Sequence, residues 1–242
     1  MNRTISSCIL LLVSIAACAQ SEPSDARALV EKMYETYKDS WYHAITFTQH
    51  TEFFKEGVKQ REETWYEAMD MKSGALVIKI NGKDSGNGMI FRNDSLLVYA
   101  DDKLKSKNYR VHELIVLGFS VYTSSPQSTL DKIKAAGFDT DMFSRELYDS
   151  RMHYVVGDPG KARFWIDAST LLFTKMTKTT QGRTQEVEFK GYQKLGKGWI
   201  ESEVTFTVNG QLVMREVYRD IQAPKSLPES FYNQVVFSRI SW

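Results

Sequence analysis

The stretch WYHAITFTQ, residues 41–49, predicts the first strand of a β-sheet. Ile45, Phe47 and, further along, Phe53 alternate with polar residues, so they share one face of the strand. One apolar and one polar face are typical of an antiparallel sheet with a single covered side. The apolar face either packs an ordinary core or lines a cavity that another molecule fills.

The rest of the chain continues this alternation, with two helical exceptions. Residues 25–41 carry apolar side chains at helical spacing behind a candidate N-cap, Asp25, and residues 112–139 interrupt the strands with apolar helical turns. Asn-Gly pairs at 81–82 and 209–210 predict hairpin turns. We count about ten or eleven strands in an antiparallel meander, and a sheet of that size must curl, split or close.

The first nineteen residues differ from the rest. Arg3 precedes a short apolar run, residues 9–17, which is typical of a secretory signal peptide rather than a membrane-spanning helix. Two interpretations of its end remain open. IAAC, residues 15–18, resembles a bacterial lipobox that would leave Cys18 lipidated, whereas ACA, residues 17–19, fits ordinary cleavage after Ala19. Both predict an exported single domain over residues 20–242, either in the bacterial periplasm or lipid-anchored to the cell envelope (outer membrane) through Cys18.

The composition and net charge of the chain exclude some classes of partner. Hydrophobic residues make up 42% and charged residues 25% of the chain, which is ordinary for a folded domain. Removing residues 1–19 removes Arg3 and no acid, so the formal charge falls from +1 to 0. Near neutrality argues against nucleic acid or an anionic membrane surface as the main partner. Both cysteines, Cys8 and Cys18, lie in the signal segment, so the domain depends on its core rather than on disulfides.

Residues that often carry catalysis occur here without the spacing that catalysis needs. His112-Glu113 begins like a zinc-binding helix motif, but position 116 is Val, and no other histidine pattern predicts a metal site. Asp167 is interpreted as the residue that closes a turn. The alternating acids are interpreted as solvent-facing; these are Glu62, Glu63, Glu186, Glu188, Glu201 and Glu203. We therefore expect no enzyme, no metal and no cofactor.

Four stretches resemble the LolA/LolB-type family, the periplasmic lipoprotein carriers and their lipid-binding relatives. They are YHAITFTQ (42–49), RNDSLLVYADD (92–102), the hairpin at 162–193 that begins ARFWIDAST, and APKSLPESFYNQ (223–234). The resemblance implies a mainly β fold with a few helices: a half-open antiparallel barrel with an N-terminal helix and a helical lid. It also implies an apolar hollow that binds acyl chains without catalysis.

The resemblance and the alternation together assign residues to the hollow. The predicted lipid-binding wall consists of Ile45, Phe47, Phe53, Leu76, Ile78, Val187, Phe189, Val204 and Phe206. The predicted lid or plug consists of Leu114, Ile115, Leu117 and Phe119. An error of one residue in strand register would exchange the wall for the outer face. Each buried methylene of an acyl chain contributes about 0.8 kcal/mol, so such a wall can hold a lipid without directed bonds.

The sequence also departs from the family. The carriers often place Arg-Pro after the second strand, where the arginine helps to hold the lid, whereas this chain has EAMDMKSGAL (67–76) with only Lys72 basic. The expected partners are lipid or lipoprotein acyl chains and other envelope proteins, bound by a monomer. The alternative hypothesis is a sensor or scaffold of the same fold whose hollow is filled by its own lid.

Overall fold

The computed structural model describes residues 22–232 and 236–242. The main element is one antiparallel sheet of thirteen strands. In spatial order these are β6 (Lys103–Tyr109), β5 (Ser95–Ala100), β4 (Gly88–Arg92), β3 (Ala75–Ile80), β2 (Val58–Asp70), β1 (Ala44–Lys55), β15 (Gln211–Gln222), β14 (Glu203–Val208), β11 (Arg183–Lys190), β10 (Phe173–Thr180), β9 (Ala162–Asp167), β8 (Arg151–Asp158) and β7 (Phe143–Tyr148).

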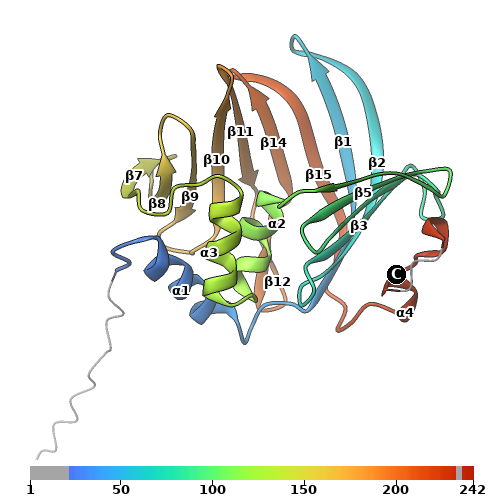
Figure 1. Cartoon of the computed structure of the whole chain (residues 1–242), viewed down its shortest axis with the longest axis horizontal. Coiled ribbons are helices and arrows are strands. Elements are labelled where there is room, and N and C mark those ends of the chain that lie inside the picture. Colours follow the sequence, from blue (N-terminus) through green and yellow to red (C-terminus); the bar gives the residue numbers. More distant parts are fainter. Residues whose placement is uncertain (1–21, 233–235) are drawn as a thin grey trace, which may run out of the picture.

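The sheet is strongly curved and open, because β6 and β7 are its two edges and do not pair with each other (Figure 1). The chain passes from one edge to the other through residues 110–142. This connection contains α2 (Glu113–Gly118), a 3-10 turn η1 (Ser120–Tyr122) and α3 (Pro126–Ala135). Figure 1 shows α2 and α3 inside the curve of the sheet. The helical interruption noted in the sequence therefore covers the concave face.

The N-terminal helix α1 (Ala26–Tyr37) supports this cover. Asp25 caps it as predicted, accepting a hydrogen bond of 2.8 Å from the backbone N–H of Ala28. Its apolar stripe is fully buried, and the helix packs against α3 and η1. Tyr37 and Tyr122 meet edge to face at 5.2 Å, and the Tyr37 hydroxyl donates to the carbonyl of Thr170 at 2.5 Å. The helices are thus joined to one another and to the β9–β10 connection.

The C-terminal segment lies on the outer side of the sheet, across β3 to β5 (Figure 1). It contains α4 (Glu229–Tyr232) and η2 (Phe237–Arg239), and Phe237 stacks on Tyr99 at 4.6 Å. The fully buried Lys79 fastens it, because its ammonium donates to the carbonyls of Lys83 at 2.6 Å and Ser238 at 2.8 Å. This half of the sheet is therefore covered on both faces.

The predicted strand count is too low. The described part of the chain has fifteen strands: the thirteen above, and a separate pair formed by β12 (Gln193–Leu195) and β13 (Gly198–Ile200). β12 and β13 have three residues each, too few to show an alternation. The pattern also missed β7, an edge strand whose Leu147 is 72% exposed and which has no clean apolar face.

Other local predictions agree with the structure. Asn209 and Gly210 have positive φ values, 50° and 76°, between β14 and β15, as a tight hairpin requires. Asp167 closes the turn after β9 by accepting from the backbone N–H groups of Ser169 and Thr170 at 2.8 and 3.0 Å. The predicted signal segment, with Cys8 and Cys18, lies outside the described residues. Within residues 22–232 and 236–242, no helix has the length and apolar character to cross a membrane.

Candidate functional site

A cavity of about 350 Å³ lies between the concave face of the sheet and α2. Its lining comes from strands on both sides of the central pair β1 and β15, and from the start of the helical connection. Side chains from the two halves of the sheet therefore meet in one hollow. A cavity of this size is near the lower end of the range for small-molecule sites and holds about a dozen water-sized groups at about 30 Å³ each.

The structure brings most of the predicted wall to this cavity. Six of the nine residues line it: Phe47, Leu76, Ile78, Val187, Phe189 and Phe206. The other three share the inner face but lie elsewhere. Ile45 and Val204 are fully buried in the adjoining core, and Phe53 lies nearer the β1–β2 hairpin, where the Arg61 guanidinium sits 3.6 Å from its ring centre. The alternation therefore predicted the correct face, and curvature decided which of its positions border free volume.

The predicted lid residues lie on the opposite side of the cavity. Leu114, Ile115 and Phe119 line it, whereas Leu117 is 1% exposed and packs in the main core. α2 therefore covers the hollow without filling it.

Two ion pairs hold the cover to the sheet. Glu113 on α2 accepts from Lys178 on β10 at 3.1 Å, and Lys178 also donates to the carbonyl of Ala136 at 3.0 Å. On the other side, Lys132 on α3 pairs with Asp94, in the β4–β5 turn, at 2.7 Å. Burial alone would raise the pKa of Glu113, but a backbone hydrogen bond and the Lys178 ammonium hold it below its ordinary value. The pairs are partly exposed, so each contributes about 0.5–1 kcal/mol and is easily broken.

His112 serves the helix rather than a metal. Its Nδ1 accepts from the backbone N–H of Ile115 at 3.4 Å and so caps α2, and its ring meets Phe91 edge to face at 4.5 Å. Burial lowers the pKa of His112 to about 4, so the ring is neutral at physiological pH.

Sequence reasoning missed a group of polar residues inside the hollow. Gln49, Glu67 and Glu216 line the cavity and are 2%, 4% and 7% exposed. Each lies two positions along its strand from a residue that faces the cavity. Glu67, for example, lies midway between Trp65 and Met69 in β2. This two-residue spacing from apolar inner-face residues is the sequence signal that could have located them.

The prediction for Glu201 is wrong. It was expected to face solvent, but it is 1% exposed and its Oε1 has no hydrogen-bond partner among the described residues. Glu201 lies between the end of β13 and the start of β14, where the chain is not a regular strand. Strict alternation therefore does not extend to it.

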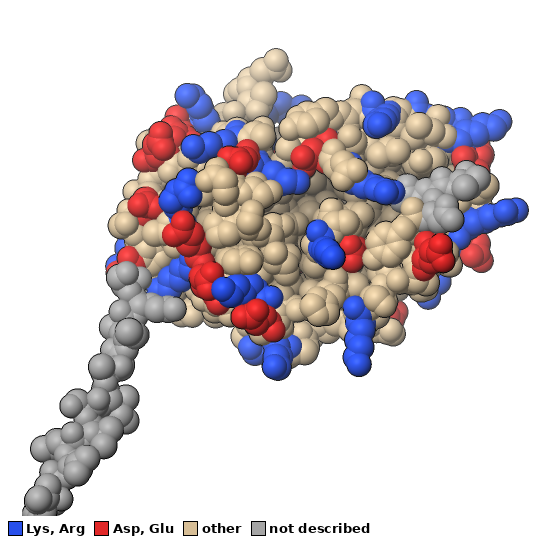
Figure 2. Space-filling view, turned by 60° about the horizontal axis from the view of Figure 1, so that its bottom comes forward, with Lys and Arg blue, Asp and Glu red and all other residues tan. Residues whose placement is uncertain are grey.

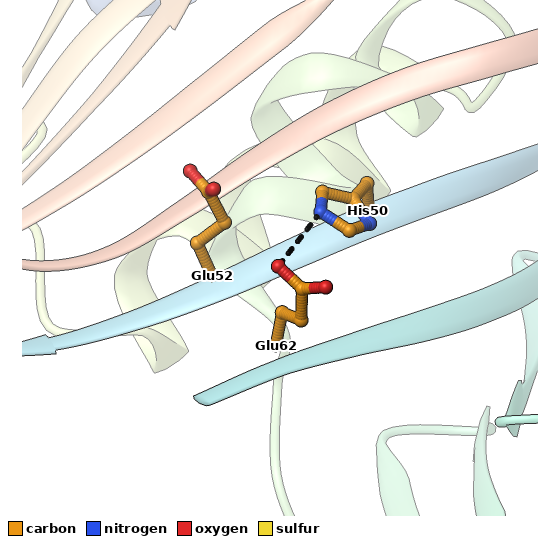
Figure 3. Close-up of side chains that lie close together, drawn as sticks. All are labelled: His50, Glu52 and Glu62. Atoms are coloured by element: carbon orange, nitrogen blue, oxygen red, sulfur yellow. Dashed lines mark ion pairs between the residues drawn. The ribbon is translucent and has the colours of Figure 1, made fainter. Parts of the chain in front are cut away.

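One exposed cluster has the composition of a cation site. His50, Glu52 and Glu62 come from β1 and β2, and their donor atoms lie within 4.8 Å of one another, with 3.5 Å between His50 Nε2 and Glu62 (Figure 3). The Lys59 ammonium already lies 2.8 Å from Glu62 and 3.3 Å from Glu52. Arg215 also lies 3.7 Å from Glu52, so two basic side chains balance the two carboxylates, and the cluster is explained as a surface ion-pair network.

A second hollow, of about 560 Å³, lies near the β7–β8 hairpin and β13. Most of its charged side chains pair with one another. Arg151 contacts Asp167 at 3.1 Å, the Tyr148 hydroxyl donates to Glu188, and Lys190 contacts Glu188 at 2.6 Å. Because these charged groups already have partners within the protein, they do not call for a ligand. The cavity under α2 is therefore the better candidate site.

On the face seen in Figure 2, acidic and basic side chains are intermixed around uncharged surface. That face therefore presents no large area of a single charge.

An open, curved antiparallel sheet with a helical connection across its hollow defines a LolA-like fold. The structure resembles a LolA superfamily protein from Nitrosomonas europaea (TM-score 0.57, 12% identity, 88% of this chain and 99% of that one). It also resembles a DUF1329 family protein from Desulfovibrio piger (0.58, 12%, 86% and 96%). A third similar structure is a putative outer membrane lipoprotein-sorting protein domain from Vibrio parahaemolyticus (0.57, 13%, 86% and 97%).

These similarities confirm the predicted resemblance at the level of the fold. No protein-family model matches the sequence, and no curated protein sequence matches it significantly.

Proposed function

We propose that this protein binds the acyl chain of a lipid or lipoprotein in the cavity under α2, and releases it when α2 moves away from the sheet. The observation that carries the proposal is the apolar hollow itself, with its wall on both halves of the sheet and its cover on the helical connection. The structures of similar fold include a putative lipoprotein-sorting domain, which supports this choice of ligand.

The size of the cavity indicates what it holds in this state. A volume of about 350 Å³ accommodates one alkyl chain of about twelve carbons, at about 30 Å³ per group. Such a chain contributes about 10 kcal/mol of transfer free energy at about 0.8 kcal/mol per methylene. Association costs of 4–15 kcal/mol offset much of this gain, so binding is reversible. A larger or branched cargo requires α2 to move outward.

The alternative is a sensor or scaffold whose hollow is plugged by its own lid. The free volume beside Leu114, Ile115 and Phe119 favours the carrier, because a plug would occupy that volume. We further propose that the chain is exported to the cell envelope, on the basis of its first nineteen residues and its fold. Labelling with a radioactive fatty acid, with Cys18→Ser as control, tests the lipid anchor.

Extraction of purified protein followed by lipid mass spectrometry tests the carrier. We expect bound lipid approaching one equivalent in the wild type and a loss of at least tenfold in Phe206→Glu, which places a charge in the wall. The matched control is Thr205→Glu, the neighbouring position on the opposite face of β14. Equal lipid in the two variants, both folded by circular dichroism, would refute the assigned wall; no lipid in any wild-type preparation would refute the carrier.

A further inference from the structure

The cavity under α2 contains two carboxyl groups that a simple acyl-chain site does not need. Glu67 on β2 and Glu216 on β15 both line it. β1 lies between their strands and pairs Phe47 with Glu67, Gln49 with Tyr218 and Thr51 with Glu216. Their registers lie four β1 positions apart, but both side chains line the hollow and the charge of Glu216 acts on Glu67, so the two carboxyls flank one stretch of the hollow from either side of β1.

The protein supplies little to balance these groups. Glu67 is only 4% exposed, and among the described residues its pKa is set by burial and by the like charges of Glu216 and Glu201, with no hydrogen bond or cation to offset them. Glu216 has the Tyr218 hydroxyl at 3.5 Å and the amide of Gln49 nearby. Another buried acid, Glu201, adds charge of the same sign when it ionises. Burying a carboxyl without partners is unfavourable, and glutamine or leucine would fill the same space at less cost.

The groups that face the carboxyls from other elements do not neutralise them either. Arg110, on the connection before α2, lines the cavity but is exposed at its edge and forms no ion pair among the described residues. His112 is neutral, and Glu113 is already paired with Lys178.

Burial and mutual repulsion raise the pKa of Glu67 well above its ordinary value, and burial raises the pKa of Glu216 to about 8. With a pKa of about 8, Glu216 is mostly protonated at neutral pH.

Aromatic rings surround the same position. Tyr218 stacks on Phe47 with ring centres 4.4 Å apart, and Trp65 lines the cavity beside Gln49, its cross-strand partner. Aromatic faces attract cations, and they do so more strongly where water is excluded. The acids and the rings therefore favour the same kind of ligand atom, a positively charged nitrogen.

We propose that the hollow binds an amphiphile whose protonated amine is attached directly to its alkyl chain, with the nitrogen between Glu67 and Glu216 and the chain along the apolar wall. The inference rests on the proposed function, acyl-chain binding, and adds the chemistry of one end of the ligand. A fatty-acid anion forms no ion pair with these carboxyls, and it is repelled by them once they ionise as the pH approaches 8. An alcohol or ester can form hydrogen bonds with a protonated carboxyl. Because it carries no charge, it forms no ion pair when the carboxyl ionises.

The proposal predicts a particular pH dependence of the binding affinity, because binding releases a proton. When the ammonium binds, a carboxyl releases its proton to solvent and forms an ion pair with the ligand. Binding coupled to the release of one proton strengthens by up to tenfold per pH unit, until the pH reaches the carboxyl pKa of about 8. A simple aliphatic amine stays protonated over this range, because its pKa resembles that of lysine, about 10.4.

The test compares three probes of equal chain length, dodecylamine, dodecanol and dodecanoate, below their micelle concentrations at pH 6 and pH 8. Titration calorimetry on the chain from residue 20 onward measures binding. We expect dodecylamine to bind at least tenfold more tightly than dodecanol at pH 8, and less than tenfold at pH 6. Glu67→Gln and Glu216→Gln should lose this preference and keep dodecanol binding, which also shows that they are folded.

The matched control is Glu186→Gln, an acid that pairs with Lys175 on the outer face of β11; it should keep the preference. Equal binding of dodecylamine and dodecanol at both pH values, tighter binding of dodecanoate, or an unchanged preference in both glutamine variants would overturn the inference and leave the proposed function standing. Failure of all three probes to bind would instead remove the proposed function, and this inference with it.

Discussion

The buried carboxyl of Glu216 makes the stability of the protein depend on pH in a direction opposite to that of an ordinary salt-bridged acid. Burial raises its pKa from 4.5 to about 8 in the folded state. Between these two values the unfolded chain loses the proton and the folded chain keeps it, so unfolding becomes more favourable as the pH rises. The stability that protonation provides is complete below pH 4.5, declines up to pH 8, and then levels off.

The size of the effect follows from the shift. One pKa unit corresponds to about 1.4 kcal/mol, and pH 7 lies two and a half units above the unfolded pKa, so holding Glu216 protonated costs about 3 kcal/mol at pH 7. Glutamine has nearly the same shape and carries no charge at any pH. We expect Glu216→Gln to match the wild type at pH 4.5 and to exceed it by up to about 3 kcal/mol at pH 7.

Urea denaturation at half-unit intervals from pH 4.5 to 8 measures this difference. Glu31→Gln, on the exposed side of α1 where the carboxylate is 51% exposed, is the control and should follow the wild type at every pH. A gap between Glu216→Gln and the wild type that stays constant across the range would refute the assignment of a raised pKa to this group. A variant less stable than the wild type at pH 7 would refute it as well.

Three further changes test the packing of the sheet, of α1 and of the helical cover. Gly157→Ala places a Cβ 2.1 Å from the carbonyl oxygen of Ala162 at a φ of +116°, so we expect a loss of about 2–3 kcal/mol in urea denaturation. Leu29→Ala empties a fully buried position on α1, and we expect a fall in thermal midpoint that corresponds to about 2–5 kcal/mol. Lys178→Met removes the ion pair to Glu113; we expect amide exchange in α2 to quicken several-fold while β-sheet exchange stays unchanged, and slower or equal exchange in α2 would count against its role in holding the cover.

The face of each long strand was predictable because it depends on a period of two. Ile45 and Phe47 share the inner face with Leu76, Ile78 and Val187, as the alternation indicated. Local chemistry was equally predictable where one side chain decides the geometry, as with the cap formed by Asp25.

The acids of the hollow were not predictable from the same pattern. Glu67 and Glu216 occupy inner-face positions, but acids spaced along a strand usually face water. Their burial arises because β2 and β15 lie on either side of β1 in a curved sheet, which encloses positions that a flat sheet would expose. The prediction for Glu201 was wrong for a different reason. Glu201 lies between β13 and β14, and the alternation of inner and outer faces applies only within a regular strand.

The sequence alone therefore determined the kind of sheet, the face of each long strand and the presence of a helical segment between two groups of strands, because these follow from local periodicity and turn chemistry. Only the tertiary structure decided that β6 and β7 remain unpaired edges, that the helical segment covers the concave side, and that free volume and unbalanced carboxyls remain beneath it. The reason is physical: the curvature of a sheet and the volume left inside it depend on contacts between residues far apart in the chain, and no local pattern records those contacts.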